Sequence, residues 1–402
     1  MSYRPFQKLK EAPPDPILGL TETFRKDANP KKVNLCIGVF QDETGHNPVL
    51  KSVKQAERMV LEQERTKDYL NMAGDEAYGQ GVRALIFGDK SPRVSDGRAS
   101  TLHTPGGTGA LRVGADFLHT HYADATLWLS DPTWPNHKGI FESAGMKVKS
   151  YPYYEAKTNG LNLQGLLKTL EEIPEGDVVL LHGCCHNPTG VDPTPQQWQQ
   201  ILEVFRRRPI IPFLDFAYQG FGRGLEEDAY AVRLFAEAGL ELLVASSFSN
   251  NLGLYRERVG ALTLISGEVE TAKRLMSQVK LNVRTNYSNP PSHGGKVVEI
   301  ILGDPTLRLL WQEEVAQMRS RIQGMRQSFV ENLKKRGVTR NFDFLMQQNG
   351  MFSFSGIGKE DVLRLRGEYG IYMTDNGRIN VAGMTPGNMG YLCDSIAAVL
   401  KG

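Results

Sequence analysis

The most informative segment of this 402-residue chain is Ser246-Ser247-Phe248-Ser249-Asn250-Asn251-Leu252-Gly253-Leu254-Tyr255-Arg256-Glu257-Arg258-Val259-Gly260. It follows the apolar run Leu242-Leu243-Val244-Ala245, which predicts a buried strand. Hydroxyl and amide side chains then form a polar loop at the end of that strand, and Arg258 is close enough in sequence to fold back onto it. Short hydroxyl donors and a guanidinium group match the oxygens of a phosphate, so the segment predicts a phosphate-binding loop.

This segment resembles the cofactor loop of the aspartate and aromatic-amino-acid aminotransferases, which are pyridoxal-phosphate enzymes of fold type I. The family pattern reads Ser-x-Ser-Lys-Asn-x-Gly-Leu-Tyr-x-Glu-Arg-Val-Gly. The chain matches it at Ser247, Ser249, Asn251, Gly253, Leu254, Tyr255, Glu257, Arg258, Val259 and Gly260. It departs at Asn250, where the family has the lysine that attaches covalently to the cofactor.

Composition and charge indicate a globular protein and argue against several classes of partner. Hydrophobic residues make up 40% and charged residues 23% of the chain, which is ordinary for a globular protein with room for two domains. The formal net charge of +2 argues against nucleic acid or an anionic membrane as a partner. Residues 1–12 show no signal peptide, and no apolar run is long enough to span a bilayer. The four cysteines form no disulfide framework, so we expect a reducing compartment and a cytoplasmic protein.

A glycine-rich turn, Thr104-Pro105-Gly106-Gly107-Thr108-Gly109, precedes a helical pattern of apolar residues. Free N–H groups at the start of a helix bind phosphate. The turn lacks the Gly-Lys-Ser/Thr ending of a Walker loop, and its spacing does not fit the dinucleotide fingerprint. Taken alone, it fits a purely structural turn equally well. The resemblance implies that Gly107 and Thr108 bind the cofactor together with Ser247, Ser249 and Arg258.

Two further loops follow predicted strands. The strand predicted over residues 125–130 ends at Asp131-Pro132-Thr133-Trp134-Pro135-Asn136-His137, where Trp134 either offers a flat face to a ligand or closes the core. The strand predicted over residues 177–181 is followed by His182-Gly183-Cys184-Cys185-His186-Asn187-Pro188-Thr189-Gly190. The resemblance implies that Trp134 stacks on the pyridine ring and that Asn187 donates to the phenolic oxygen of the cofactor.

The His-Gly-Cys-Cys-His run in the second loop raises the question of a metal site. Structural zinc sites take paired ligands from separate knuckles, and adjacent cysteines fit a tetrahedral geometry poorly. We therefore expect no metal here and interpret His182 and His186 as packing groups or as groups that support the site.

An acidic residue ends the strand predicted over residues 210–214, in the sequence Asp215-Phe216-Ala217-Tyr218. A buried carboxylate is costly unless it is paired with a cation. A protonated pyridine nitrogen is such a cation, and the resemblance implies that Asp215 binds it while Tyr218 contacts the phenolic oxygen. Pro212 is unexpected inside a strand because it lacks a backbone donor, and either an edge position or a bulge would explain it.

Two positions near the N-terminus gain a role only from the resemblance. The segment through Pro13-Pro14-Asp15-Pro16 predicts an extended arm or a frayed terminus, and residues 33–39 predict a strand that contains Gly38. Tyr69, on sequence grounds alone, is a packing residue. The resemblance implies that the arm docks on a second subunit, that Gly38 lies over the substrate, and that Tyr69 reaches the cofactor phosphate of the other subunit in a homodimer.

Two arginines are candidates for substrate binding. Arg284 lies in a polar segment and could be a surface charge, whereas Arg378 interrupts an apolar strand predicted over residues 377–382. A buried guanidinium group requires a carboxylate or a similar partner. The resemblance implies that Arg378 binds the α-carboxylate of the substrate. It also implies that Arg284 crosses from the other subunit to the side-chain carboxylate of a dicarboxylic substrate.

Strand and helix patterns alternate between residues 100 and 265 and predict a doubly wound α/β sheet. Apolar residues then recur at three- and four-residue steps up to Gly337 and predict one long helix, capped by Asp304. With the resemblance, these patterns predict a large cofactor-binding domain over residues 43–317, with a mostly parallel seven-stranded sheet flanked by helices. A smaller α+β domain combines the N-terminal arm and the rest of residues 1–42 with residues 318–402.

The expected reaction is pyridoxal-phosphate-dependent transamination of aspartate or an aromatic amino acid with 2-oxoglutarate. In the family the lysine first holds the cofactor and then moves a proton, and an amide can do neither. We therefore expect the chain with Asn250 to bind the cofactor non-covalently and to turn over weakly or not at all. A non-catalytic binder of cofactor or amino acid, and a different chemistry such as β-elimination, are the alternatives. Because the other site residues are kept, one replaced position in a working enzyme is favoured over a decayed site.

Overall fold

The computed structural model describes residues 4–12 and 18–401. The α-helices are α1 (Leu18–Lys26), α2 (Lys51–Gln63), α3 (Glu76–Phe87), α4 (Gly106–His121), α5 (Asn136–Ser143), α6 (Leu163–Glu172), α7 (Pro195–Arg207), α8 (Leu225–Asp228), α9 (Tyr230–Glu237), α10 (Val269–Asn286), α11 (Ser292–Gly303), α12 (Pro305–Lys335), α13 (Lys359–Tyr369) and α14 (Pro386–Lys401). The 3₁₀ helices are η1 (Pro5–Lys8), η2 (Pro92–Val94), η3 (Asp343–Gln347) and η4 (Val381–Gly383). The strands are β1 (Val33–Asn34), β2 (Ala99–Pro105), β3 (Thr126–Asp131), β4 (Lys147–Pro152), β5 (Tyr154–Glu155), β6 (Gly160–Leu161), β7 (Val178–His182), β8 (Ile211–Phe216), β9 (Leu242–Ser247), β10 (Val259–Ile265), β11 (Phe352–Phe354), β12 (Ile371–Tyr372) and β13 (Arg378–Asn380).

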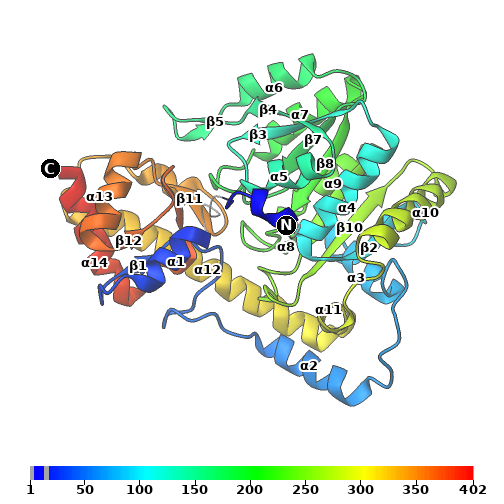
Figure 1. Cartoon of the computed structure of the whole chain (residues 1–402), viewed down its shortest axis with the longest axis horizontal. Coiled ribbons are helices and arrows are strands. Elements are labelled where there is room, and N and C mark those ends of the chain that lie inside the picture. Colours follow the sequence, from blue (N-terminus) through cyan, green and yellow to red (C-terminus); the bar gives the residue numbers. More distant parts are fainter. Residues whose placement is uncertain (1–3, 13–17, 402) are drawn as a thin grey trace.

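A seven-stranded sheet lies at the centre of the larger part of the molecule (Figure 1). Its strand order is β2-β10-β9-β8-β7-β3-β4. The strands from β9 through β4 pair in parallel, and β10 runs antiparallel to both of its neighbours. Helices flank this sheet, as Figure 1 shows. The predicted fold class, an α/β fold with a mostly parallel seven-stranded sheet, is confirmed.

Each face of the sheet has its own hydrophobic core, because successive side chains of a strand point to opposite faces. On β8, Phe213 packs in one buried cluster with Leu111 of α4, and Leu214 packs in the other with Trp198 of α7. Gly114 lets α4 approach the sheet, since a Cβ there would lie 2.7 Å from Cζ of Phe213. The central strands, and the loops at their carboxyl ends, are thus held from both sides.

Pro212 lies in β8, in the middle of the sheet and in continuous register with β7, so both expected explanations, an edge strand and a bulge, are wrong. The backbone N–H of Ile211 donates to the carbonyl of Asp177 on the β7 side. Because successive N–H groups alternate between the two sides of a strand, the nitrogen of Pro212 faces β9. Pairing with β9 begins only at Phe213, so the proline removes no ladder hydrogen bond.

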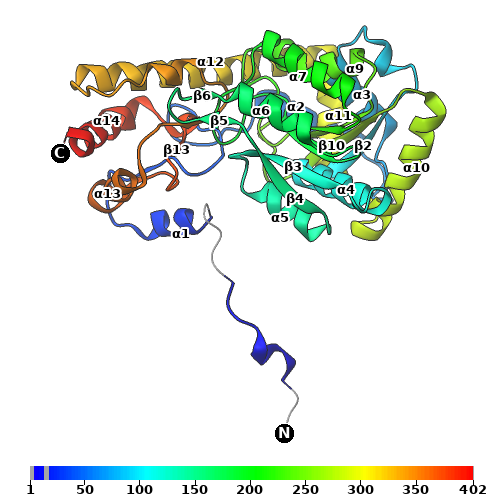
Figure 2. The ribbon, with the colours of Figure 1, turned by 90° about the horizontal axis from the view of Figure 1, so that it is seen from above.

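The long helix α12 connects the sheet with the C-terminal elements, as Figure 2 shows. Asp304 caps it, since its Oδ1 accepts two backbone N–H groups of the first turn at 2.8 and 2.9 Å, and Pro305 occupies the first position. These features confirm the predicted start of the helix. Farther along, Nε1 of Trp311 donates to the carbonyl oxygen of Asn251 at 2.7 Å. The helix therefore fixes the loop that follows β9.

Segments from the two ends of the chain form a smaller group of elements. β1 pairs in parallel with β12, and β11 pairs antiparallel with β13. In Figure 1, α1, α13 and α14 gather around these strands, away from the large sheet. The division into residues 43–317 and the remainder stays a prediction. The predicted arm at Pro13–Pro16 lies outside the described residues, while η1 in residues 4–12 leaves Phe6 exposed.

The strand predicted over residues 33–39 is shorter than expected, since β1 has only two residues. A side chain of the C-terminal segment replaces the missing neighbouring strand. Nδ2 of Asn380 donates to the carbonyl oxygens of Ile37 at 2.6 Å and Val39 at 3.0 Å. Two carbonyl groups that a neighbouring strand would have paired are thereby satisfied, one on either side of Gly38.

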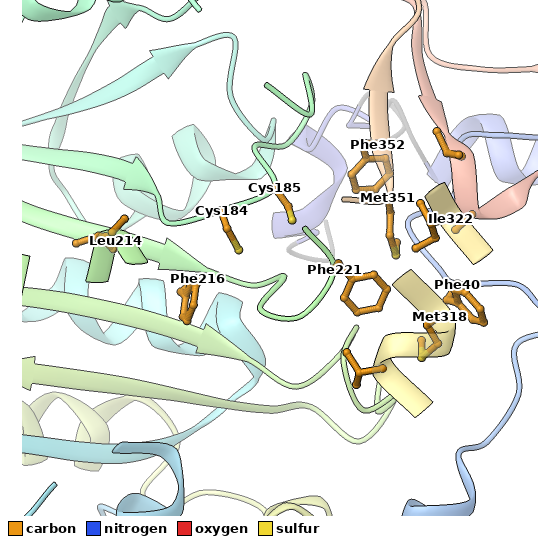
Figure 3. Close-up of a cluster of buried hydrophobic side chains, with 14 of the residues drawn as sticks. Phe40, Cys184, Cys185, Leu214, Phe216, Phe221, Met318, Ile322, Met351 and Phe352 are labelled. Carbon is orange, nitrogen blue, oxygen red and sulfur yellow. The ribbon is translucent and has the colours of Figure 1, made fainter. Parts of the chain in front are cut away.

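Buried side chains also fill the space between the sheet and α12 (Figure 3). Phe216 of β8 and Phe221 of the following loop belong to the same cluster as Met318 and Ile322 of α12 and Phe352 of β11. Burial of one such side chain contributes roughly 1.5–3 kcal/mol. This cluster therefore fixes the position of the C-terminal elements relative to the ends of the strands.

A buried histidine of β2 makes the stability of the fold depend on pH. His103 packs against Tyr78, with ring centroids 4.5 Å apart, and its Nε2 has no partner among the described residues. Burial lowers the pKa of His103 from 6.5 to about 4. Between pH 6.5 and pH 4, His103 therefore binds a proton in the unfolded chain but not in the folded chain. The free energy of unfolding thus falls as the pH falls.

We expect His103 to account for a loss of about 3 kcal/mol in the free energy of unfolding between pH 7 and pH 4. Urea unfolding of the chain and of His103→Gln across this range measures it, and the variant should show a flatter dependence on pH. His46→Gln, at an exposed histidine, is the control. Equal slopes for the chain and His103→Gln would contradict the assignment.

Candidate active site

A cavity of about 180 Å³ lies at the carboxyl ends of the central strands, where β8 and β9 finish. Open α/β sheets bind ligands at this edge. Eleven of the fourteen predicted site residues line the cavity: Gly38, Gly107, Thr108, Trp134, Asn187, Asp215, Tyr218, Ser247, Ser249, Asn250 and Arg258. Asp215 and Ser247 are still part of their strands, rather than just beyond them as the sequence suggested.

One end of the cavity presents hydrogen-bond donors from two segments. Gly107 and Thr108 lie in the first turn of α4, and Ser247 and Ser249 belong to the end of β9 and the loop after it. Nη1 of Arg258 lies 3.5 Å from Oγ of Ser249. This convergence of hydroxyls, a guanidinium group and the positive end of a helix suits a phosphate.

Glycine is required where the arginine approaches the start of α4. A Cβ on Gly106 would lie 2.5 Å from Nη2 of Arg258, and Gly106 has a φ of +74°. Arg258 itself has a positive φ of 57° and donates from Nη1 to the carbonyl of Tyr255 at 2.9 Å. The left-handed backbone at both residues brings the guanidinium group against the helix start.

The middle of the cavity contains a buried carboxylate, Asp215, held by a histidine. Oδ2 of Asp215 lies 2.9 Å from Nε2 of His137, whose Nδ1 lies 2.7 Å from Oγ1 of Thr133. His137 is completely buried, and its ring meets that of Trp134 edge-on at 5.2 Å. The network orients the carboxylate, and the indole of Trp134 forms part of the cavity wall beside it.

A second polar group joins the loop after β7 to the C-terminal segment. Nδ2 of Asn187 donates to the hydroxyl oxygen of Tyr218 at 3.5 Å, and Nη1 of Arg378 donates to Oδ1 of Asn187 at 3.4 Å. Burial, and then the charge of Asp215, raise the pKa of Tyr218, so the phenol remains a donor at neutral pH. Arg378 therefore lies beside the cavity through Asn187, although it is not part of the lining.

Arg378 is buried, and no carboxylate of the described residues pairs with it. Its Nη2 donates to the carbonyl of Cys36 at 2.7 Å, the guanidinium group lies over the ring of Phe352 at 4.4 Å, and Nε has no partner in the described part of the chain. Burial lowers the pKa of this guanidinium group. A cation with an unused donor next to a cavity is suited to bind an anionic ligand.

Asn250 lines the cavity, and of the two polar groups of its side-chain amide only one has a hydrogen-bond partner among the described residues. The side chain is buried, and its Nδ2 donates to the carbonyl of Ala217 at 3.3 Å. Its Oδ1 has no partner among residues 4–12 and 18–401. An amide at this position can donate and accept hydrogen bonds, but it is neither a nucleophile nor a base.

Besides Arg378, two predicted site residues do not line the cavity of their own chain. Tyr69 is 92% exposed, and Arg284 is exposed and contacts Oγ of Ser288. Their roles, and those of the other predicted residues, therefore remain predictions.

Sequence reasoning assigned no role to two residues that shape the site, His137 and Tyr255. Tyr255 lines the cavity, and its hydroxyl oxygen accepts the backbone N–H of Phe40 at 2.9 Å. His137 ends the segment that carries Trp134, so its place after a strand was the one available signal. Its contact with Asp215 spans 78 residues and has no local sequence pattern.

A family model, aminotransferase class I and II, matches residues 30–396. The chain belongs to this family. The aspartate aminotransferase of Escherichia coli strain K12 is 54% identical to this aminotransferase over 395 residues, which cover 98% of this chain and 100% of that protein. The aromatic-amino-acid aminotransferase of Pseudomonas aeruginosa is 48% identical over 394 residues, which cover 98% of each protein.

A solved structure is also similar to this aminotransferase. The aromatic-amino-acid aminotransferase of Burkholderia pseudomallei, crystallised covalently bound to pyridoxal phosphate, superposes with a TM-score of 0.97 at 49% identity. The match covers 99% of this chain and 100% of that one. The family predicted from the loop after β9 is therefore confirmed.

Proposed function

We propose that this aminotransferase binds pyridoxal phosphate non-covalently and transaminates aspartate or an aromatic amino acid with 2-oxoglutarate slowly or not at all. The observation that carries the proposal is the composition of the cavity. It contains the predicted cofactor-binding residues together with Asn250, at the position where the family resemblance places a lysine. Relatives named for aspartate and for aromatic amino acids support the substrate class.

The residues present fit the phosphate end of this cofactor. Ser247, Ser249 and Thr108 supply hydroxyl donors, the first turn of α4 supplies backbone N–H groups, and Arg258 supplies the positive charge. Such charge-assisted hydrogen bonds are the strong ones. A dianionic group with several acceptor oxygens would satisfy all of these donors at once.

The residues also fit the ring of the cofactor. When bound, pyridoxal phosphate supplies an aldehyde and an electron-withdrawing ring that stabilises negative charge at the α-carbon of an amino acid. Asp215, oriented by His137, would pair with the protonated ring nitrogen, and Trp134 would cover the ring. Asn187 and Tyr218 would donate to the phenolic oxygen, since both have donor groups at the cavity.

Arg378 would bind the α-carboxylate of the amino acid, since it is buried beside the cavity with a free donor. Gly38 forms part of the cavity wall and would lie over the substrate, and its lack of a side chain lets Phe352 pack against it, since a Cβ there would lie 2.9 Å from the ring of Phe352. Orientation of the substrate by such fixed groups is independent of the lysine. We therefore expect amino-acid binding to persist in the chain with Asn250.

We propose that the functional unit is a homodimer in which Tyr69 and Arg284 complete the cavity of the other subunit. Both side chains are exposed and do not line the cavity of their own chain. Sedimentation velocity should give twice the mass of one chain. A species with the mass of a single chain at micromolar concentration would contradict this arrangement.

We also propose a cytoplasmic location. The four cysteines are buried and free, as expected in a reducing compartment. Within residues 4–12 and 18–401, the helices include none long and apolar enough to cross a membrane. Fractionation of the cells that produce the protein tests this location, and recovery with the membrane fraction would contradict it.

Replacing Arg258 tests the phosphate end directly. Arg258→Gln should lower the affinity for pyridoxal phosphate by about 10- to 150-fold, because hydrogen bonds to a charged group contribute about 1.5–3 kcal/mol. Equilibrium dialysis with the chain as it stands measures the dissociation constant without any need for turnover. Arg256→Gln is the matched control, since Arg256 is exposed and does not line the cavity. Equal affinities for Arg258→Gln and Arg256→Gln would contradict the site.

A non-catalytic binder of the cofactor or of an amino acid is the second candidate, and Asn250 is the observation that favours it. Both candidates bind the cofactor non-covalently. They differ in the outcome of restoring a lysine at position 250, since a binder whose other groups are no longer aligned would not gain activity.

A further inference from the structure

We propose that Cys184, Cys185 and Asp228 form a binding site for a thiophilic divalent cation of the Zn²⁺ or Cd²⁺ class. Sγ of each cysteine and a carboxylate oxygen of Asp228 all lie within 4.8 Å of one another, and the three residues are buried. Two thiolates and a carboxylate are ligands that these ions accept, with water as a fourth. None of the three residues lines the cofactor cavity, so this site is distinct from it.

In the sequence, the adjacency of the two cysteines argued against a metal site. The backbone conformation of the loop nevertheless allows both side chains to point to the same side. In an extended chain, neighbouring side chains point to opposite sides. Cys185 instead has a φ of +52°, and in Figure 3 both sulfur atoms lie on the same side of the loop. A tetrahedral ion with sulfur ligands at about 2.3 Å holds two thiolates roughly 3.8 Å apart. The two sulfur atoms lie within 4.8 Å of each other, so they are at most about 1 Å farther apart than in such a site.

The carboxylate is held in place for this purpose by the turn after β8. Oδ2 of Asp228 accepts the backbone N–H groups of Gly220 and Gly222, at 2.8 and 2.9 Å, and Oδ1 accepts that of Arg223 at 2.8 Å. With a single donor, Oδ1 keeps a lone pair for a cation. Gly222 makes the approach possible, because a Cβ there would lie 2.5 Å from Oδ1.

A small cavity gives an ion access to two of the three groups, Cys184 and Asp228. It measures about 50 Å³, which is enough for one water molecule or ion, and Cys184 and Asp228 line it. Its other charged lining groups are Asp192, Glu227 and Arg223. Three carboxyl groups against one guanidinium group favour a cation over an anion.

The loop that carries the two thiols also carries Asn187 of the cofactor cavity. Asp192 already holds this loop by accepting the backbone N–H groups of Cys185 and His186, each at 2.9 Å. A bound cation would add a link from the loop to Asp228. We therefore expect thermal stability of the full chain to rise when the ion is added.

Titration of the full-length chain with Cd²⁺, with and without pyridoxal phosphate, tests the site. Ultraviolet thiolate-to-Cd²⁺ charge-transfer absorption should saturate at one ion per chain. Cys184→Ala and Cys185→Ala should each raise the Cd²⁺ dissociation constant at least tenfold. Cys393→Ala removes a buried thiol elsewhere in the fold and should leave the titration unchanged.

Two results would overturn the proposal: absorption that does not saturate at one ion per chain, and a Cd²⁺ dissociation constant of Cys184→Ala equal to that of the unaltered chain. A second possible cluster, His137, His182 and Asp215, contains no thiol and cannot give this band. If the alanine variants do not fold, peptide mapping of the unaltered chain decides. Cd²⁺ must slow alkylation of Cys184 and Cys185 but not of Cys393, and equal rates would refute the site.

Discussion

Asn250→Lys is expected to raise the rate of transamination between aspartate and 2-oxoglutarate by about 10²–10⁴-fold, the range that a positioned general acid–base contributes. The reason lies in what the cavity already contains. The groups that would hold the cofactor and the substrate line it or lie beside it, but the side chain at position 250 is an amide, which cannot take up a proton. A lysine at this position would supply an amine for covalent attachment of the cofactor and for proton transfer at the α-carbon.

The control for this gain is Asn250→Met, which has nearly the length of a lysine but no amine. It should leave the rate at the level of the unaltered chain. A coupled assay that follows oxaloacetate production from aspartate measures all three proteins. The account is wrong if Asn250→Lys gains no activity while still binding the cofactor, or if Asn250→Met gains as much as the lysine variant.

The second large effect concerns Asp215. In the Asn250→Lys background, Asp215→Asn should lower the transamination rate by about 10²–10³-fold, the loss typical when one preorganised electrostatic group is removed. Asp215 is buried, and its Oδ2 is held by Nε2 of His137 at 2.9 Å. An amide has the same shape, but it cannot keep a ring nitrogen protonated.

Asp131→Asn, in the same background, is the matched control. Asp131 also ends a strand of the large sheet, but its side chain is exposed and does not line the cavity. Its rate should be unchanged. Measuring the rate as a function of cofactor concentration separates the two roles of Asp215, because lost cofactor affinity is overcome by excess cofactor and a lost electrostatic contribution is not. Full recovery of the rate at saturating cofactor would contradict the proposed role.

Residues at the ends of strands were within reach of sequence analysis because each follows a short apolar run. Asp215 and Ser247 could be placed near one another since parallel strands finish at the same edge of a sheet. Arg378 was recognisable as a charge inside an apolar strand. The roles of Arg378, Asp215 and Ser247, however, were predicted from the family resemblance. The structure adds the hydrogen bond between Arg378 and Asn187.

Contacts between distant side chains were out of reach. The bond between His137 and Asp215, and the approach of Asp228 to the two cysteines, depend on how separate segments pack. The presence of Pro212 inside a strand could be explained only from the register of β7, β8 and β9. The strand predicted over residues 33–39 ends early for a similar reason, since the side-chain amide of Asn380, rather than a second strand, bonds the carbonyl groups of Ile37 and Val39.

Borohydride reduction followed by intact-mass measurement tests the central claim, that Asn250 leaves the cofactor bound but not attached. The chain is saturated with pyridoxal phosphate, reduced, denatured and weighed, beside Asn250→Lys treated in the same way. We predict an unchanged mass for the chain with Asn250, and a mass increased by one cofactor at position 250 for the lysine variant. A stoichiometric adduct on the chain with Asn250, or none on the variant, would contradict the account.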